Sequence, residues 1–189
     1  MELRHALLTT LAGPLLAVSD DVGLRHLHIL GEADTWPLQL SRLVDGLADG
    51  LADEAEEPIL QEDPAHFKSL VQQLGEYFTG CRQIFDLTLA PRGTEFQEQV
   101  WTLLRDIPYG DFRSYSQLAG DLGEPRAARA VGQAAAQNPL PILVPCHRLL
   151  GTRGNLVGFA GGTDLKARLL RLEGHTLAAG ARVRPPRLF

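Results

Sequence analysis

The sequence predicts an α+β protein with two domains, and three observations support this fold class. The chain has 189 residues, 44% of them hydrophobic and 22% charged, which suits a globular protein with one ample core or two small ones. Strand-like segments fall in the first half, whereas helical spacing of apolar residues continues through the second half. The charge balance changes sign near residue 90: residues 1–90 carry 5 basic and 15 acidic side chains, and residues 91–189 carry 13 and 8. Turn residues at 90–93 coincide with this change, so we expect domains at 1–90 and 91–175 and a basic tail at 176–189.

The N-terminal domain is predicted to be a small antiparallel three-stranded sheet with helices. Residues 7–18 and 23–30 read as strands around an acidic turn, and residues 84–89 read as the third strand. Leucine and valine at helical spacing over residues 40–51 predict a helix, followed by a loose acidic connection as far as residue 62. A second helix is expected from residues 63–64, where Asp-Pro is a good helix start, to residue 80.

The C-terminal domain is predicted to be mainly helical. Thr94 and Ser114 are each followed three residues later by glutamine, a capping-box spacing that marks the start of a helix. Pro-Tyr-Gly at residues 108–110 ends the first helix. The turn at residues 123–125 separates the second helix from an alanine-rich helix over residues 126–137, so this pair has a helix-turn-helix pattern.

The alanine-rich helix has two interpretations. It carries Arg126 and Arg129, which are neighbours on a helix surface because they are three residues apart. Small side chains are typical of a tightly packed core helix. They also allow a helix backbone to approach a nucleic-acid groove closely, where arginines reach phosphates or enter the base stack.

The last part of the chain contributes a loop, a helix and a tail. Residues 156–162 are glycine-rich, so the backbone there can approach a ligand. A helix is expected to begin at a Thr163 cap and to end at residues 173–174. The chain from His175 onward is expected to be poorly ordered, as chain ends usually are.

The most chemically suggestive residue is Cys146, which follows an apolar run at residues 141–145 and precedes His147 and Arg148. A lone cysteine in such a run is commonly a small core residue. The thiolate is the reactive form, and the thiol pKa of roughly 8.5 falls only near positive charge, a helix N-terminus or a base. His147 and Arg148 are candidates to supply that environment. Neighbours in a strand point to opposite faces. A direct thiol–imidazole pair therefore requires the strand to end at Pro145, and otherwise a water molecule must relay the proton.

Other residues exclude several function classes. Cys81 and Cys146 permit at most one disulfide, which is improbable in the cytoplasmic protein that we expect from the lack of a signal peptide or membrane span. His26 and His28 share one face of a predicted strand but have no third ligand nearby, so no metal is predicted.

Several motifs together resemble the O6-alkylguanine-DNA alkyltransferase family. Pro-Cys-His-Arg at residues 145–148 is preceded by Arg-Ala-Val-Gly at 129–132 and Asn-Pro at 138–139, and it is followed by Leu-Glu-Gly-His at 172–175. The resemblance covers residues 94–175, and residues 77–93 resemble the interdomain region of bacterial members. It implies a ribonuclease H-like N-terminal domain and a monomer that needs no cofactor. The implied partner is double-stranded DNA containing O6-alkylguanine, with O4-alkylthymine as a second substrate.

The resemblance also implies catalytic roles. Cys146 would attack the alkyl carbon and keep the group as a thioether, so that the protein is spent after one turnover. His147 would act as a base through a bound water, and Glu173 would orient the imidazole. Tyr115 would donate its hydroxyl to N3 of the departing guanine. Asn138 would connect the DNA-binding helix to the active-site turn.

DNA binding and the substrate pocket follow from the same resemblance. The target nucleotide must leave the stack, with Arg129 filling its place from the minor groove and Tyr115 crowding the adjacent phosphate. The residues expected to contact DNA are Arg129, Arg126, Tyr115, Ser114, Ala130 and Gly132. Those expected to line the substrate pocket are Pro141, Leu149, Phe159, Ala160 and Gly161. Backbone carbonyls near Cys146 and Leu149 would hold the exocyclic amine, and the Ala160 amide would face O6.

Some positions depart from the family pattern. Leu149 stands where valine is usual, Phe159 where tyrosine is common, and Ala136-Gln137 lack a basic residue found in many relatives. Gly161 replaces a bulky tryptophan of some relatives, which suggests that larger groups such as benzyl could enter.

Two alternatives differ in class from a repair alkyltransferase. A non-catalytic sensor of alkylated DNA would commonly have tryptophan in place of the cysteine, so Cys146 argues against it. A thiol enzyme unrelated to DNA would not need the arginines of the 126–137 helix.

Overall fold

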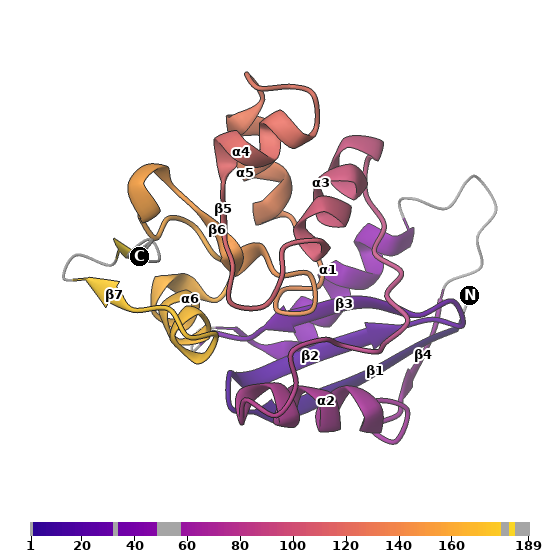
Figure 1. Cartoon of the computed structure of the whole chain (residues 1–189). Coiled ribbons are helices and arrows are strands. Elements are labelled where there is room, and N and C mark those ends of the chain that lie inside the picture. Colours follow the sequence, from indigo (N-terminus) through magenta and orange to yellow (C-terminus); the bar gives the residue numbers. More distant parts are fainter. Residues whose placement is uncertain (1, 32–33, 49–57, 179–181, 184–189) are drawn as a thin grey trace. The chain divides into compact units, whose positions relative to one another are not determined.

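The computed structural model describes residues 2–31, 34–48, 58–178 and 182–183, and the chain divides into two compact units, Met1–Pro91 and Arg92–Phe189 (Figure 1). Both strands and helices are present, so the α+β fold class is confirmed. Residues 49–57, which belong to the expected acidic connection, lie outside the described residues.

The first unit is built on a mixed sheet with the strand order β3-β2-β1-β4. β1 (Glu2–Thr10), β2 (Gly13–Ser19) and β3 (Leu24–Ile29) are antiparallel to their neighbours, whereas β4 (Ile59–Glu62) lies parallel to β1. The expected strand at 23–30 is therefore confirmed as β3, but the expectation of a three-stranded antiparallel sheet is wrong.

The single strand expected over residues 7–18 is a hairpin. The chain reverses at Leu11 and Ala12, where the Thr10 hydroxyl accepts from the Ala12 amide (3.1 Å) and donates to the Gly13 carbonyl (2.8 Å). Gly13 has a φ of +106°, which a residue with a side chain rarely adopts. The apolar residues on both sides of Gly13-Pro14 were read as one strand, although this pair and the Thr10 hydroxyl together form the turn.

The prediction also missed one strand, β4, where a connection was expected, and it placed a strand at residues 84–89 that did not form. All four residues of β4 are exposed, so no apolar alternation marks the strand. Residues 84–89 were expected as the third strand, but they contribute only an isolated bridge between Leu24 and Leu89. Gln73 holds that segment instead, because its side chain makes two hydrogen bonds of 2.8 Å with the backbone of Asp86.

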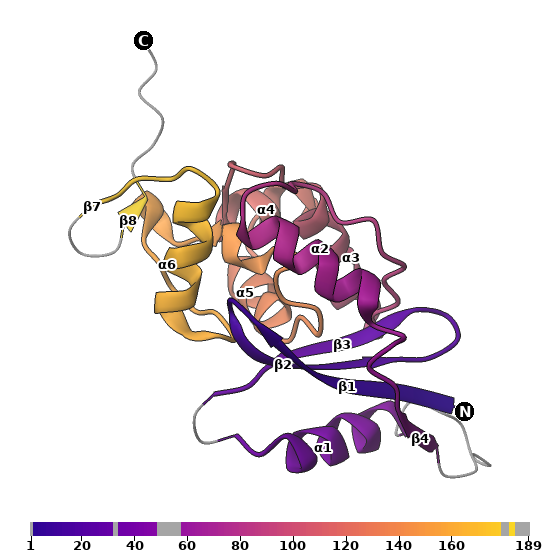
Figure 2. The ribbon, with the colours of Figure 1, turned by 90° about the horizontal axis from the view of Figure 1, so that it is seen from below.

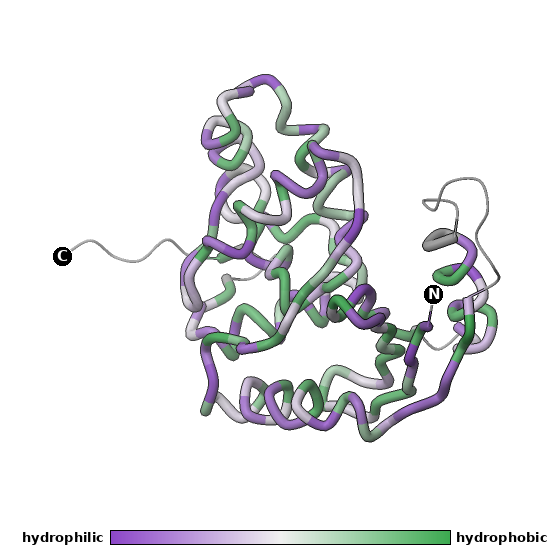
Figure 3. Tube along the Cα trace, turned by 90° about the vertical axis from the view of Figure 1, so that its right-hand side faces the viewer, coloured by the Kyte–Doolittle hydropathy of each residue, from purple (hydrophilic) through white to green (hydrophobic). Residues whose placement is uncertain are grey.

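Helices cover the two faces of this sheet, α1 (Trp36–Ala48) on one face and α2 (Lys68–Phe78) on the other (Figures 1 and 2). On the α1 side, a buried cluster joins the strands to the helix through Leu3, Leu16, Val18 and Leu40. α2 begins at Lys68 rather than at the Asp-Pro pair, because residues 64–67 form a turn first. Hydrophobic and hydrophilic stretches alternate along the helices, as expected when one helix face is buried (Figure 3).

The second unit contains α3 (Glu95–Arg105), α4 (Tyr115–Asp121) and α5 (Ala128–Ala136). Both expected capping boxes are confirmed, with Thr94 and Ser114 as the N-caps of α3 and α4. The alanine-rich helix α5 starts two residues later than expected. One of its faces is core, with Val131, Ala134 and Ala135 buried, and the Trp101 indole of α3 donates to the Ala134 carbonyl (2.9 Å).

Short elements complete the second unit. β5 (Arg113–Ser114) pairs in parallel with β6 (Leu149–Leu150), and the 3-10 helices η1 (Cys146–Arg148) and η2 (Thr152–Gly154) flank β6. α6 (Gly162–Leu172) follows. Its N-cap is Gly161 without a side-chain cap, so the Thr163 cap is wrong and Thr163 lies inside the first turn.

The tail is partly ordered, contrary to expectation. β7 (Leu177–Ala178) pairs with β8 (Arg182–Val183), and Val183 is buried in a cluster with Leu150 and Leu170. The remaining basic tail, residues 184–189, lies outside the described residues.

Candidate functional site

The segment that carries Cys146 is a tight turn followed by a 3-10 helix, so the expected strand end is wrong. The Val144 amide donates to the Leu140 carbonyl (2.8 Å), and the Cys146 amide donates to the Val144 carbonyl (2.8 Å). Ile142 has a φ of +78°, which is strained for a β-branched residue. Prolines on both sides of the run disfavour a strand, because they cannot donate to its ladder.

Asn138, which follows α5, anchors this turn at three points. Its Nδ2 donates to the Val144 carbonyl (2.8 Å) and to the Cys146 sulfur (3.1 Å), while its Oδ1 accepts from the Leu140 amide (3.0 Å). Asn138 is itself buried. A single side chain therefore joins the end of α5, the turn and the thiol.

Cys146 is a buried thiol with a raised pKa. Burial raises the pKa, while the hydrogen bond from Asn138 and the charge of Lys166 oppose this effect only in part. The side chain is 6% exposed. At neutral pH the sulfur carries its proton, so nucleophilic attack requires a base to remove it.

His147 and Glu173 converge as the resemblance implied. His147 Nε2 lies 2.9 Å from Glu173 Oε1, and both residues are buried. Burial raises the pKa of Glu173, but hydrogen bonds from His147 and Arg148 outweigh this and bring it to about 2. The carboxylate is therefore ionised and accepts a hydrogen bond, which assigns the imidazole proton to Nε2.

The other imidazole nitrogen is the candidate base. Within the described part of the chain, His147 Nδ1 is buried and has no hydrogen-bond partner. Burial lowers the pKa of His147, although Glu173 raises it, so the net shift favours the neutral ring. A neutral ring with a proton on Nε2 leaves the Nδ1 lone pair available to accept a proton.

Tyr115 is the first residue of α4, and its hydroxyl donates to the Val157 carbonyl (3.3 Å). The Ser114 capping box fixes the start of this helix, with the Gln117 amide donating to the Ser114 hydroxyl (3.1 Å). Gly132 of α5 lies against the Tyr115 ring, because a Cβ placed there would be 3.6 Å from two ring carbons. Burial raises the pKa of Tyr115, and the nearby Cys146 raises it further, so the phenol remains a donor.

Lys166 is a site residue that the sequence did not indicate. It is fully buried, and its Nζ donates to the carbonyls of Leu149 (2.5 Å), Val157 (2.8 Å) and Gly158 (3.1 Å). Burial lowers its pKa to about 8, although Cys146 opposes the shift. A lysine next to a leucine stripe is usually solvent-exposed, so no sequence signal distinguishes this one.

Arg148 was expected to be a candidate for the positive charge beside the thiol, but its contacts lie elsewhere. Its guanidinium binds the Glu173 carboxylate through Nε and Nη2, at 2.9 Å from Oε2 and 2.8 Å from Oε1. Arg148 is buried. The ammonium of Lys166, rather than this guanidinium, is the cation whose charge acts on Cys146.

The expected pocket residues divide into buried and exposed members. Pro141 and Leu149 are buried, and the Phe159 ring lies edge-on to the His147 ring with 6.2 Å between centroids. Ala160 is exposed and Gly161 is half-buried at the start of α6.

The expected DNA contacts lie on the accessible side of the α4–α5 pair. Arg126 and Arg129 are exposed, whereas Ser114, Ala130 and Gly132 are half-buried. The buried face of the alanine-rich helix agrees with the core interpretation, while the nucleic-acid interpretation of its exposed arginines stays a prediction.

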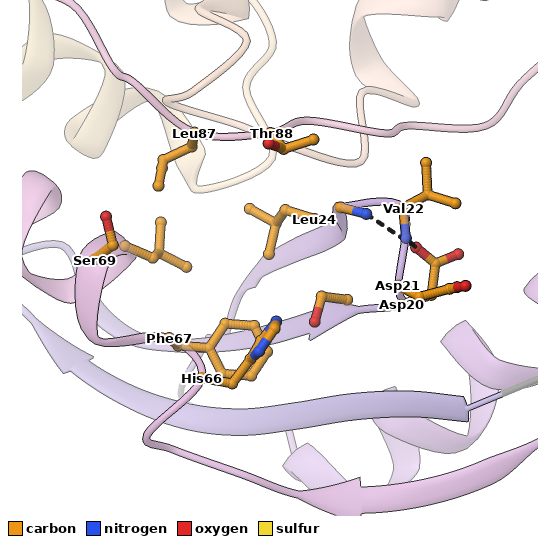
Figure 4. A pocket seen from close by; sticks show the side chains of 12 residues that line it. Asp20, Asp21, Val22, Leu24, His66, Phe67, Ser69, Leu87 and Thr88 are labelled. Atoms are coloured by element: carbon orange, nitrogen blue, oxygen red, sulfur yellow. Dashed lines mark hydrogen bonds between the residues drawn. The ribbon is translucent and has the colours of Figure 1, made fainter.

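The first unit holds a separate pocket of about 240 Å³, whose lining includes Asp20, Val22, Leu24, His66 and Phe67 (Figure 4). The Asp20 carboxylate of this pocket is already hydrogen-bonded within the protein. Asp20 accepts from the amides of Val22 (2.9 Å) and Gly23 (3.1 Å) and from Arg25 Nε (2.7 Å), which holds the β2–β3 turn. We assign no chemistry to this pocket.

The residues that the structure describes contain no cluster of three or more histidine, cysteine, aspartate or glutamate residues suited to a metal ion. No described helix has the length and hydrophobicity needed to cross a membrane. Both cysteines are free thiols, with Cys81 exposed and Cys146 buried.

A buried thiol held by an asparagine, beside an imidazole–carboxylate pair with a free imidazole nitrogen, defines a protein of the cysteine-nucleophile class. Comparison with known proteins narrows this class. The family described as 6-O-methylguanine DNA methyltransferase, DNA binding domain, matches residues 95–175.

The matches to known proteins cover from 59% to 92% of the chain. A methylated-DNA–protein-cysteine methyltransferase of Methanosarcina acetivorans is 38% identical over 176 residues, which cover 90% of this chain and 97% of that protein. The protein of the same name from Mycolicibacterium paratuberculosis is 52% identical over 112 residues, 59% of this chain and 68% of that one. The crystal structure of Mycobacterium tuberculosis OGT in complex with DNA is similar with a TM-score of 0.72 and 36% identity, covering 92% of each chain. The chain belongs to the methylated-DNA–protein-cysteine methyltransferase family, as its sequence motifs indicated.

Proposed function

We propose that this protein repairs O6-alkylguanine, and also O4-alkylthymine, by transferring the alkyl group from DNA to its own Cys146. The observation that carries this proposal is the thiol with its base: Asn138 holds the sulfur, and His147 presents a free Nδ1 in the same buried turn. The family assignment supports the substrate class, because the relatives are named for transfer of a methyl group from methylated DNA to a protein cysteine.

The proposed reaction balances around one sulfur atom. His147 Nδ1 accepts the thiol proton through a bound water, with Glu173 orienting the ring from Nε2. The thiolate then attacks the alkyl carbon, forming a carbon–sulfur bond, and the bonding electrons leave with O6 of guanine. Tyr115 donates its proton to N3 of the departing base, and the imidazolium of His147 gives up the former thiol proton to the tyrosinate through water, so that both residues end neutral. Because a thioether has no leaving group that water can displace, the protein is not regenerated.

The substrate is proposed to be selected by residues of the Cys146 turn and of the loop before α6. Pro141, Leu149 and Phe159 supply apolar walls, the Ala160 amide faces O6, and the Leu149 carbonyl accepts from the exocyclic amine. Lys166 already occupies one lone pair of that carbonyl, so a second remains for the substrate. Gly161 adds no bulk, which supports entry of groups as large as benzyl. Failure of O6-benzylguanine to inactivate the protein would refute this breadth.

DNA binding is proposed for the α4–α5 pair acting as a helix-turn-helix. The exposed Arg129 replaces the flipped nucleotide in the stack from the minor-groove side, while Arg126, Ser114, Ala130 and Gly132 contact the backbone. Tyr115 crowds the adjacent phosphate. Contacts of this kind give binding that depends strongly on salt and little on sequence.

We also propose that residues 91–175 form the DNA-binding and alkyl-transfer domain and that residues 1–90 form a ribonuclease H-like supporting domain. The protein is proposed to act as a cytoplasmic monomer, because its chemistry requires a reduced thiol and access to DNA.

The decisive experiment uses duplex DNA that carries O6-methylguanine with a radiolabelled methyl group. One equivalent of label is expected on Cys146, with none released to solvent. Cys146→Ala should bind the duplex without accepting label, while Cys81→Ala, a matched change at the exposed thiol, should retain full transfer. Tight binding without transfer by the unmodified protein would support a sensor instead, and neither binding nor transfer would support an unrelated thiol enzyme.

A further inference from the structure

Arg148 is the residue of the active-site turn that the proposed mechanism leaves without a role. It directly follows His147 in η1, and its guanidinium makes three hydrogen bonds to the Glu173 carboxylate, between 2.8 and 3.2 Å. Only 6% of Arg148 is exposed, so water contributes little to the charge balance of this pair.

The arginine is itself held in place by the turn that follows α3. Its Nη1 donates to the Ile107 carbonyl (2.5 Å), and its guanidinium carbon lies 5.9 Å from the centre of the Tyr109 ring. The Tyr109 hydroxyl donates to the Leu172 carbonyl (2.8 Å). The same turn approaches Glu173 closely, because a Cβ at Gly110 would lie 3.2 Å from the Glu173 carbonyl oxygen. This turn thus fixes both members of the arginine–carboxylate pair.

The charge balance around Glu173 determines whether the His147 ring is neutral or protonated. One cation and one carboxylate together are neutral, so the imidazole donates from Nε2 while remaining uncharged. Without the guanidinium, the buried carboxylate would need another cation nearby. The adjacent imidazole can become that cation by taking a proton on Nδ1, the atom needed to accept the proton of Cys146.

We infer that Arg148 is a positioning residue for the base: it neutralises and orients Glu173 so that His147 stays a neutral proton acceptor for Cys146. This inference rests on the proposed alkyl transfer, in which His147 is the base.

The charged and titratable groups that face this pair agree with the inference. Glu173, Arg148 and Lys166 act on His147, His147 and Arg148 act on Glu173, and Glu173 and Arg148 act on Tyr109. The pKa of His147 is lowered first by burial, then raised by Glu173, and lowered again by the charges of Arg148 and Lys166. Removing Arg148 therefore moves the pKa of His147 upward.

The test is the pH dependence of the second-order rate constant of alkyl transfer, measured for Arg148→Met and Arg148→Gln. Both variants lack the positive charge of Arg148. The glutamine keeps a hydrogen-bond donor for Glu173, so this variant is expected to fold even if the methionine variant does not. The acid limb of the rate profile is expected to move up by at least about one pH unit, a roughly tenfold lower rate on that limb. The rate should recover at high pH. Arg148→Lys, which keeps the charge, should restore the wild-type limb.

Arg171→Met is the matched control, because it removes the same charge from an exposed position two residues before Glu173. Its rate profile should overlay that of the wild type. A variant of Arg148 that lowers the rate equally at every pH, or that leaves the acid limb in place, would overturn the inference and assign Arg148 a purely structural role.

A second readout separates this inference from the proposed reaction. In a Cys146→Ala background, which cannot transfer, nitrogen-15 NMR reports the protonation state of His147 directly. The wild-type ring should remain neutral with the proton on Nε2, while the Arg148→Met ring should take up its second proton at a higher pH than the wild-type ring does. An unshifted titration would refute the role of Arg148 even if transfer is confirmed. A shifted titration without wild-type transfer would refute the reaction instead.

Discussion

Replacing Asn138 with alanine should destabilise the second unit and should also lower the rate at which the Cys146 thiol is alkylated. The change leaves the buried Leu140 amide without its Oδ1 acceptor and removes the Nδ2 donor from the Val144 carbonyl and the Cys146 sulfur. An unsatisfied buried amide costs about 1–3 kcal/mol, and a typical lost hydrogen bond adds about 1 kcal/mol. The Val144 carbonyl still accepts from the Cys146 amide, so its loss is only partial. We expect the free energy of unfolding to fall by about 2–4 kcal/mol.

The measurement uses the two tryptophans of the chain. In a Trp36→Phe background, the fluorescence of Trp101 follows urea unfolding of the second unit alone. The rate of thiol alkylation by iodoacetamide should also fall at a fixed pH, because the hydrogen bond from Asn138 lowers the pKa of Cys146. Gln133→Ala, which removes an exposed amide from α5, should leave both measurements unchanged. A loss of stability below about 0.5 kcal/mol, the ordinary surface effect, would refute the reasoning.

Three further predictions test other parts of the site. Tyr115→Phe removes the proposed proton donor to guanine and should lower the rate of alkyl transfer by about 10²-fold or more, the scale of general acid catalysis; a rate within twofold of wild type would exclude that role. Arg129→Ala should weaken binding to alkylated duplex DNA in gel-shift titrations far more than Arg105→Ala, a change at an exposed arginine on α3; equal effects would place the DNA elsewhere. Glu173 has a pKa of about 2 in the folded protein against an ordinary value of 4.5, so its ion pairs add stability above pH 4.5 that is lost as the pH falls toward 2. This contribution is about 3 kcal/mol, and Glu173→Gln should flatten the stability curve in that range when urea unfolding is repeated between pH 6 and pH 3; an unchanged slope would contradict the pairing.

Local signals in the sequence were reliable where they depended on a few adjacent residues. The capping boxes at Thr94 and Ser114 were predicted correctly, because each is a reciprocal pair of hydrogen bonds between residues three apart. Strands were harder to predict. β4 is exposed along its whole length, and the β1–β2 hairpin turns within an apolar run, so neither shows the alternation on which strand prediction depends.

The sequence by itself determined the class of chemistry. Cys146 and His147 are adjacent, and the motifs around them occur in the order and spacing of a known family, so the family and the proposed roles of Cys146, His147 and the distant Glu173 could be stated in advance. What it could not determine was the electrostatic setting. Lys166 and Arg148 are ordinary cations in the sequence, and only folding takes them out of water, Lys166 onto three backbone carbonyls and Arg148 onto Glu173.

The tertiary structure also decided the backbone conformation at Cys146 and His147, whose side chains would point to opposite faces in a strand. A tight turn followed by a 3-10 helix replaces the expected strand end, and Asn138 from the end of α5 holds that turn against the sulfur. Burial is a property of the packed chain and not of any short segment. Because burial sets the direction of the shifts at Cys146 and His147, the need for a base and the availability of one both arise only in the folded protein.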